Sequence, residues 1–353
     1  MAIKKKTLIA AILASVSGFS AMTVASVLIA YDAVFPRIER PNYAITPGLV
    51  CYERIKDVLP RQEFYFSPKK NQTLKGYYYE SVSKKGLVVL AHGFRSGADD
   101  YLNITQSLVQ SGYNVFTYDC TGTYDSYGES TVGMCQSLVD LDGVLTYLQA
   151  TDPYKSQPLF LIGHSWGGYA VASVLALQPA VRAAACLAPM YNGYTMMLEK
   201  GEEYVGKLAI TAKPVFTVYQ RILFKEYTEH HSVRGINSTN APVLVAHGVD
   251  DKTIVYDKQS ITAHRHEITN PNVEFLTTTG VQGTHDGILL SKNASLYRSE
   301  IKSRILLLEK EKGRKLTDDE LAAFYATIDH ALYSEVNQEL LSRVVQTFDG
   351  ANQ

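Results

Sequence analysis

The stretch Gly163-His164-Ser165-Trp166-Gly167-Gly168 follows an apolar run at residues 158–163 and precedes small apolar residues at 169–172. A serine in a G-x-S-x-G motif between a buried strand and a helix occupies a very tight turn, which exposes its hydroxyl at the helix amino terminus. Gly163 and Gly167 are needed because side chains two positions from Ser165 would collide with the adjoining strand and helix. A chance match to the bare motif is the alternative, and the flanking strand and helix argue against it. The stretch therefore predicts a strand, a sharp turn that carries a nucleophilic serine, and a helix.

Short apolar runs alternate with longer helical stretches on both sides of this motif. Six continuous runs predict strands that are buried on both faces, and two tyrosine- and phenylalanine-rich runs precede them. The eight predicted strands span residues 62–68, 74–80, 86–91, 113–119, 158–163, 181–188, 242–247 and 273–279. This alternation predicts an α/β fold with a mostly parallel central sheet and helices on both faces. Ligands bind beyond the carboxyl ends of such strands, which is where Ser165 lies.

A serine hydroxyl is a weak nucleophile, so the chain must also supply a base and an orienting carboxylate, in the order Ser, Asp, His. Asp251 is the favoured acid because it follows the run at 242–247 with Gly-x-x-Asp spacing, and the adjacent Asp250 is the alternative. His285 is the predicted base because it follows the last strand in a glycine-flanked loop. The other downstream histidines are expected to lie elsewhere: His264 and His266 in a polar stretch, and His330 in the carboxy-terminal tail.

Backbone N–H groups are also needed to stabilise the oxyanion of a tetrahedral intermediate. The amide after the nucleophile, that of Trp166, is one candidate. The other is the amide of Phe94, in the loop after residues 86–91, where Gly93 lets the backbone turn. A plain strand-ending turn would also explain the sequence His92-Gly93, but its occurrence together with the serine motif favours an oxyanion hole.

These motifs together resemble those of the α/β-hydrolases. They are His92-Gly93-Phe94, the stretch Asp119…Gly122…Gly128-Glu129-Ser130, residues 163–168, Gly248…Asp251 and Gly283…His285. The chain is most similar to the serine aminopeptidase and monoacylglycerol lipase branch, including membrane-anchored bacterial hydrolases of that type, over about residues 60–300. The resemblance implies an α/β-hydrolase fold with a helical cap insertion, and acyl transfer to water through an acyl-serine intermediate. One departure is an insertion at residues 123–127, which is expected to narrow the rim of the pocket.

The composition limits the possible partners. The 353 residues include 34 Lys and Arg against 35 Asp and Glu, so the basic excess that nucleic-acid binding requires is missing. The four cysteines form no CxxC pair and have no histidines at zinc-ligand spacing, so neither a metal nor another cofactor is expected. Cys120 and Cys135 are candidates for a disulfide only in an oxidising compartment. No pattern indicates the oligomeric state.

The amino-terminal leader carries the one long uncharged run. Residues 7–31 contain no charged side chain and follow Lys4, Lys5 and Lys6. As a helix the run would be roughly 37 Å long, enough to cross a hydrocarbon core of about 30 Å. This predicts a membrane anchor, with a cleaved secretory signal as the alternative. The excess of lysines before the run places the amino terminus in the cytoplasm and the catalytic domain outside it, either anchored or secreted.

The predicted organisation is a leader at residues 1–31, a linker at 32–60, a hydrolase domain at 61–313 with a cap at about 190–240, and a helical extension at 314–353. In the cap, an apolar stripe at helical spacing is expected to pack: Val215, Val218, Tyr219, Ile222 and Leu223. Another apolar group is a candidate lining for an acyl pocket: Tyr191, Tyr194, Met196, Met197 and Leu198. In the extension, Thr317 and Glu320 form a capping-box pattern before an amphipathic helix. That helix is expected to pack against the body, with a partner or membrane surface as the alternative.

The leading functional hypothesis is a serine hydrolase that cleaves a carboxylic ester with a medium-chain or lipid-like acyl group. Ser165 would attack, His285 would act as general base and acid, and Asp251 would orient it. A serine aminopeptidase-like enzyme acting on short peptides is the alternative, because Glu199, Glu202 and Glu203 in the cap could bind a substrate amine. A binding module without turnover is the third hypothesis.

Overall fold

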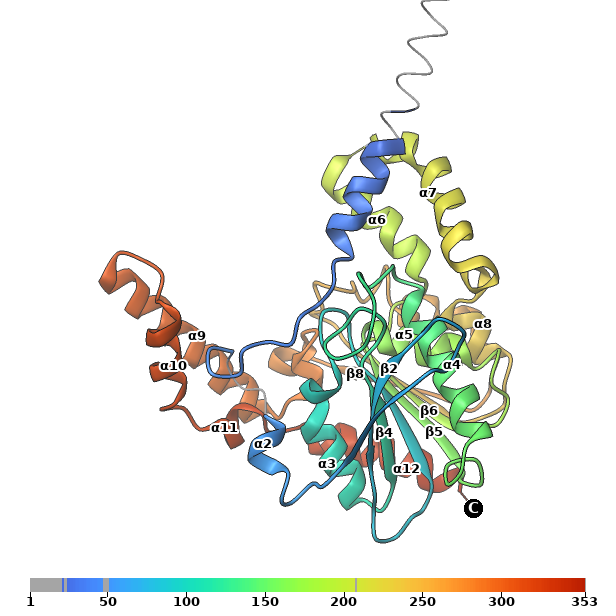
Figure 1. Ribbon diagram of the computed structural model, residues 1–353, viewed down its shortest axis with the longest axis horizontal. Helices are drawn as coiled ribbons and strands as arrows, with labels where there is room; N and C mark the ends of the chain where they lie inside the picture. The colour runs from blue at the N-terminus through green and yellow to red at the C-terminus, as the bar shows by residue number, and fades with distance from the viewer. Residues whose placement is uncertain (1–20, 22–23, 47–50, 207, 353) are drawn as a thin grey trace, which may run out of the picture.

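The computed structural model describes residues 21, 24–46, 51–206 and 208–352 (Figure 1). Its centre is an eight-stranded sheet in the order β1-β2-β4-β3-β5-β6-β7-β8. The strands are β1 (Gln62–Phe66), β2 (Leu74–Tyr79), β3 (Leu87–Ala91), β4 (Asn114–Tyr118), β5 (Leu159–His164), β6 (Val181–Leu187), β7 (Val243–Gly248) and β8 (Val273–Thr278). The β1–β2 and β2–β4 pairs are antiparallel and the other pairs are parallel. Every predicted strand is present within two residues of its expected bounds, which confirms the mostly parallel sheet.

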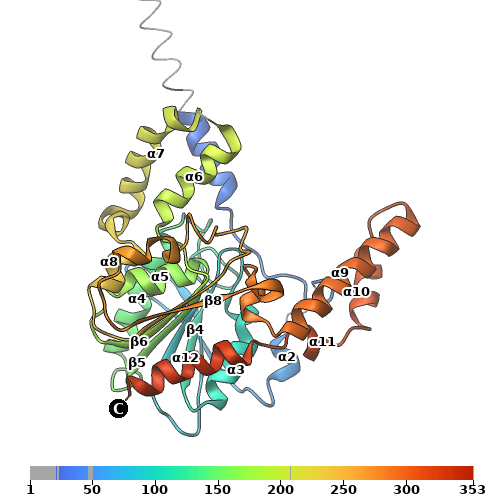
Figure 2. The ribbon, with the colours of Figure 1, turned by 180° about the vertical axis from the view of Figure 1, so that it is seen from behind.

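Each face of the sheet carries its own hydrophobic core. In β3, Leu87 and Val89 belong to one core and Val88 and Leu90 to the other, because successive strand side chains point to opposite faces. One face is covered by α4 (Gln136–Ala150), α5 (Trp166–Val174) and α8 (Ser232–Asn237), and the other by α3 (Leu102–Gln110) and α12 (Gln338–Gly350). Figure 2 shows α12 lying across the strands from behind. Burial on both faces explains why the strand sequences are continuously apolar.

A helical cap stands above the carboxyl end of the sheet. It consists of α6 (Gly193–Val205) and α7 (Leu208–Phe224), and the helical residues 24–34 lie beside it (Figure 1). Tyr31, Phe35 and Phe216 form a small core between them. The predicted stripe on α7 is wrong at two positions, because Val218 and Ile222 are 59% and 68% exposed. The buried face of α7 instead contains Phe216, Gln220 and Phe224, which places Val218 and Ile222 toward solvent.

The segment after the leader helix lies along the body. Ile38 forms a β-bridge with Thr123, and Arg37 donates hydrogen bonds of 2.9 Å to the carbonyls of Ser126 and Gly128. Arg40 forms a salt bridge of 2.5 Å with the buried carboxylate of Asp99. The insertion at 123–127, expected at the pocket rim, therefore contacts residues 37–40. The segment continues to the short helix α2 (Tyr52–Ile55).

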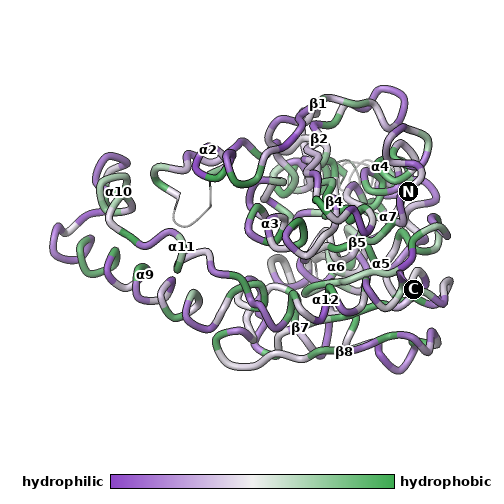
Figure 3. Tube along the Cα trace, turned by 90° about the horizontal axis from the view of Figure 1, so that it is seen from below, coloured by the Kyte–Doolittle hydropathy of each residue, from purple (hydrophilic) through white to green (hydrophobic). Residues whose placement is uncertain are grey.

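Three helices form an arm that projects from the body (Figure 1). The arm consists of α9 (Lys292–Lys312), α10 (Asp318–Tyr325) and α11 (His330–Tyr333), and its shared core contains Ile301, Tyr325, Ile328 and Tyr333. Figure 3 shows hydrophilic and hydrophobic residues alternating along α9. The predicted capping box is present, since Thr317 Oγ1 accepts from the Glu320 amide and Glu320 accepts from the Thr317 amide. The predicted amphipathic helix thus begins where expected, but it packs on α9 within the arm and not against the body as expected.

The two ends of the arm meet at its base. Leu290 and Val336 form an antiparallel β-bridge, and the Ser291 amide donates a 2.9 Å hydrogen bond to the carbonyl of Glu335. After this closure the chain returns to the sheet as α12, whose Phe348 ring packs against Tyr113 and Phe160. The last helix is therefore part of the main core.

Most of the expected membrane-spanning run lies outside the described residues, since 7–20, 22 and 23 are not among them. Within the part of the chain that the structure describes, no helix is both long enough and apolar enough to cross a membrane.

The turn from β5 to α5 is as tight as the glycines predict. Ser165 has φ 56° and ψ −115°, a conformation that is rare for a residue with a side chain. A Cβ atom on Gly163 would lie 2.3 Å from the carbonyl oxygen of Gly167, and one on Gly167 would lie 2.0 Å from that of Ala91 in β3. Only glycine at these two positions lets the turn sit against the neighbouring strand.

Replacing Gly167 with alanine should lower the free energy of unfolding by about 3 kcal/mol, because the new methyl group would overlap with the backbone of β3. The matched control is Gly350→Ala, at the end of α12, where no atom lies within 4 Å of the added methyl group. Urea denaturation of both variants measures the difference. Equal stability of the two variants would contradict this account of the turn.

Candidate active site

Ser165 and His285 are hydrogen-bonded at the carboxyl edge of the sheet. The Ser165 hydroxyl lies 2.9 Å from His285 Nε2, and the Ser165 amide donates to the carbonyl of Leu187 at 2.8 Å. His285 comes from the loop after β8, 120 residues further along the chain. The two side chains predicted as nucleophile and base are thus within proton-transfer distance.

Asp251 is the carboxylate that faces His285. Its Oδ2 lies 2.6 Å from His285 Nδ1, and its Oδ1 accepts hydrogen bonds from the amides of Thr253 and Ile254 at 2.8 and 2.9 Å. Burial alone would raise the pKa of Asp251, but hydrogen bonds from His247 and His285 hold it well below its usual range. The carboxylate therefore stays ionised across the physiological pH range.

The alternatives for the acid and the base lie elsewhere. Asp250 is exposed, and its amide donates to the carbonyl of Gly283. His264 stacks on Tyr191 with ring centroids 3.7 Å apart, His266 is exposed, and His330 begins α11. Of the candidates weighed from the sequence, the structure brings together Ser165, Asp251 and His285.

The two candidate oxyanion donors lie on segments that pack together. Trp166 is the first residue of α5, where a backbone N–H has no partner within the helix. The Phe94 ring contacts the Trp166 ring edge to face, with centroids 5.5 Å apart. The Phe94 loop is closed by a hydrogen bond of 2.8 Å from Ser96 Oγ to the carbonyl of Gly93, with Arg95 at φ 62°. Packing and the tight loop therefore fix the backbone that carries both amides.

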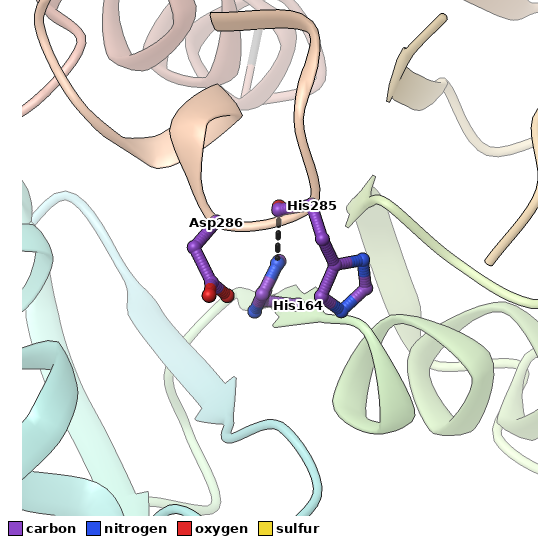
Figure 4. A group of neighbouring side chains, drawn as sticks. All are labelled: His164, His285 and Asp286. Atoms are coloured by element: carbon purple, nitrogen blue, oxygen red, sulfur yellow. Dashed lines mark hydrogen bonds between the residues drawn. The ribbon is translucent and has the colours of Figure 1, made fainter. Parts of the chain in front are cut away.

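A buried hydrogen-bond chain, which no motif in the sequence indicates, connects three loops of the site. The Gly93 amide donates to the Tyr101 hydroxyl at 2.9 Å, and that hydroxyl lies 2.9 Å from His164 Nδ1. His164 Nε2 lies 3.1 Å from the carbonyl oxygen of His285 (Figure 4). Burial lowers the pKa of His164 to about 4, so the ring is neutral at pH 7.

The directions of these hydrogen bonds follow from the chemistry of each group. The His285 carbonyl can only accept, so His164 Nε2 carries the proton and Nδ1 accepts from Tyr101. The Tyr101 oxygen in turn accepts from Gly93. This series of hydrogen bonds thus joins three segments: the loop at Gly93, which contains the candidate oxyanion donor; the turn at Ser165; and the loop at His285. Tyr101 has no sequence signal, because its hydroxyl reaches His164 only through the fold.

His164, His285 and Asp286 bring potential metal-ligand atoms within 4.8 Å of one another. Figure 4 shows these three side chains. Both ring nitrogens of both histidines already have hydrogen-bond partners: Tyr101 and a carbonyl for His164, and Asp251 and Ser165 for His285. An ion bound here would have to displace these contacts, so hydrogen bonding accounts for the group.

Ser165 and His285 open into a cavity of about 500 Å³. Its other walls are the Phe94 loop, the start of α3, the segment around Leu290, and Arg298 from the arm. Among the described residues of the predicted cap, 190–240, none lines this cavity. The prediction that cap residues line an acyl pocket is therefore wrong. Met196 belongs to the main core, Tyr191 stacks on His264, and three others pack in the cap core: Tyr194, Met197 and Leu198. The sequence carried no signal that the arm would reach the cavity.

The chain is similar in sequence to one family of enzymes and to one curated protein. Residues 82–235 match the sequence model of the family described as serine aminopeptidase, S33. Protein phosphatase methylesterase 1 of Candida albicans is 26% identical over 128 residues, which are 36% of this chain and 35% of that protein. The chain thus spans about a third of the length of this curated relative.

Solved structures share the fold, and two of them illustrate it. The esterase Pf2001 of Pyrococcus furiosus has a TM-score of 0.53 and 20% identity, over 78% of this chain and 99% of that one. The α/β hydrolase GrgF from Penicillium sp. sh18 has a TM-score of 0.51 and 16% identity, over 71% of this chain and 99% of that one. With its mostly parallel sheet and helices on both faces, the chain has an α/β-hydrolase fold, and over residues 82–235 it is similar to the serine aminopeptidase family.

Proposed function

We propose that the chain is a serine carboxylesterase that works through an acyl-serine intermediate. The observation that carries the proposal is the continuous hydrogen-bond relay from Ser165 through His285 to Asp251, which opens into the 500 Å³ cavity. A cavity of this volume accommodates a small or medium-sized ester.

The reaction follows from the relay. Ser165 Oγ attacks the ester carbonyl while His285 Nε2 removes the hydroxyl proton. The amides of Phe94 and Trp166 then stabilise the tetrahedral oxyanion. His285 returns the proton to the departing alcohol, leaving an acyl group on Ser165. Water repeats the attack with His285 as base, which releases the carboxylic acid and restores the serine.

Asp251 acts through His285. Its hydrogen bond to Nδ1 keeps the proton on that nitrogen and leaves Nε2 free to accept the serine proton. Because its pKa lies well below neutrality, Asp251 also stabilises the imidazolium that forms during the attack. The two backbone hydrogen bonds to Oδ1 hold the carboxylate in this orientation.

The surroundings of the cap glutamates favour an ester over a peptide with a free amine. Glu199 accepts a 2.8 Å hydrogen bond from Gln259, and Glu203 forms a 2.8 Å ion pair with Lys200. Neither lines the cavity that contains Ser165. These carboxylates already have partners on the cap surface, so Glu199 and Glu203 do not supply the amine site that the aminopeptidase alternative requires.

A fluorophosphonate probe should label the folded wild-type protein at Ser165, because the probe reacts with serines activated by a base. The variant Ser165→Ala should show no adduct, and its rate of ester hydrolysis should fall by about 10³-fold or more. Mass spectrometry of the labelled peptide identifies the site. Absence of an adduct on folded wild-type protein would instead favour a binding module without turnover.

Asp251→Asn should reduce kcat for ester hydrolysis by about 10³- to 10⁴-fold, because an amide favours the wrong tautomer of His285. Asp250→Asn is the matched control, since it makes the same chemical change at an exposed neighbour. Its kcat should stay within about twofold of wild type. Steady-state kinetics on one ester decide the matter, and a larger loss in the Asp250 variant would reverse the assignment.

Tyr101→Phe should lower kcat/KM by about tenfold, because it leaves the Gly93 amide and His164 Nδ1 without partners, at about 1–3 kcal/mol each. The control is Tyr118→Phe, which removes a buried hydroxyl for which no hydrogen-bond partner occurs in the described part of the chain. Initial rates and thermal midpoints should be compared for the two variants. Identical kinetics would show that the buried chain does not position the loops.

A further inference from the structure

Arg298 reaches from the arm into the cavity that contains Ser165 and His285. It lies on α9, and its side chain is held at two points on α11. Nε donates a 2.8 Å hydrogen bond to the carbonyl of Tyr333, and the guanidinium carbon lies 4.6 Å from the centre of the Tyr333 ring. The arginine is therefore fixed in place before any ligand arrives.

The guanidinium is in no ion pair in the part of the chain that the structure describes. Within the described residues, no carboxylate oxygen lies within 4.0 Å of its nitrogens, whereas the buried Asp99 is paired with both Arg40 and Arg61. Asp286 is the carboxylate whose charge acts on Arg298, and it lies beyond ion-pair distance. Burial lowers the pKa of Arg298, but a guanidinium stays protonated at neutral pH. A partly desolvated, unpaired cation is a strong attractor for an anion.

Arg298 retains the donors that a carboxylate needs. Nε is occupied by Tyr333, and neither terminal nitrogen donates a hydrogen bond to another described residue. These two nitrogens can therefore form paired hydrogen bonds to the two oxygens of one carboxylate. The lining of the same cavity also includes the apolar side chains of Leu102, Leu289 and Leu290. Such a lining suits a short methylene chain.

We propose that Arg298 is a specificity-determining residue that binds a carboxylate on the substrate, so that the preferred ester carries a carboxylate at some distance from the bond that is cleaved. The inference rests on the proposed esterase function and names the substrate class of that same site. A half-ester of a dicarboxylic acid is the simplest member of this class.

A second cation, Arg95, also lines the cavity. Its side chain is exposed and lies over the Phe94 ring at 5.5 Å, without the backbone hydrogen bond that fixes Arg298. Solvent screens the charge of an exposed side chain and weakens its attraction for an anion. The structure therefore assigns the carboxylate to Arg298.

The test compares mono-4-nitrophenyl adipate with 4-nitrophenyl hexanoate, which have acyl chains of the same length and differ in the terminal carboxylate. The full-length wild-type protein should prefer the adipate by about tenfold in kcat/KM. Arg298→Gln should remove this preference through KM and leave the hexanoate within about twofold of wild type. Arg298→Lys, which keeps the charge and loses the paired donors, should retain part of it.

Three further variants separate charge recognition from structural effects. Arg304→Gln changes a cavity-remote arginine on the same helix, which lies over Phe324, and should leave the preference intact. Asp286→Asn removes the nearby negative charge and should increase the adipate-to-hexanoate ratio. Arg95→Gln should have the smaller effect of the two cavity arginines.

Several outcomes would overturn the inference. Equal losses on both esters in Arg298→Gln would mean that the residue only supports the arm, and loss of the preference in Arg95→Gln would move the site to that residue. A wild-type protein that labels with fluorophosphonate but shows no preference for the adipate would reject the inference and leave the esterase intact. Failure to label Ser165 would reject the esterase itself.

Discussion

The backbone contact between the β5–α5 turn and strand β3 is the constraint on which the rest of the site depends. Because Gly167 lies against Ala91, the turn at Ser165 and the loop that contains Phe94 leave the sheet from neighbouring strand ends. Gly248 makes a similar approach to Gly283, which brings the carboxylate loop beside the histidine loop. Because these backbones are in contact, their separation can vary little. The register of the parallel sheet therefore sets the distances between the side chains that follow the strands. The geometry of the candidate active site is therefore largely a property of the sheet.

Buried charge is used in two different ways in this molecule. Asp99 is compensated by Arg40 and Arg61, and these ion pairs hold residues that precede the sheet against its edge. Asp251 is compensated by hydrogen bonds from histidines and backbone amides, and one of these partners, His285, is the base of the proposed reaction. The first network holds the segment that precedes the sheet in place, and the second keeps the carboxylate of Asp251 ionised next to His285. Arg298 differs from both because its charge has no protein partner within ion-pair distance among the described residues.

The sequence predicted those parts of the structure that depend on local pattern. Continuous apolar runs identify all eight strands, and glycine spacing identifies the turn at Ser165, because both rest on short-range sterics and burial. The choice of Asp251 over Asp250 also followed from spacing. The lining of the cavity did not, because it depends on how distant segments meet. Val218 looked like a packed residue and is exposed, while Tyr101 and Arg298 carry no motif and reach the site through tertiary structure.

The arm is an insertion in the chain, and the bridge between Leu290 and Val336 joins its two ends at the body. Helix α12 follows the arm, and its Phe348 belongs to the core on one face of the sheet. Deletions from the carboxyl terminus would therefore remove part of this core before they reach the arm. The arm can instead vary in length or sequence between two fixed points, as a hairpin loop does. A change confined to residues 292–333 would then alter what enters the cavity while the nucleophile turn and its relay stay unchanged. Under the proposed function, evolution or engineering could then adjust substrate choice and bond cleavage separately.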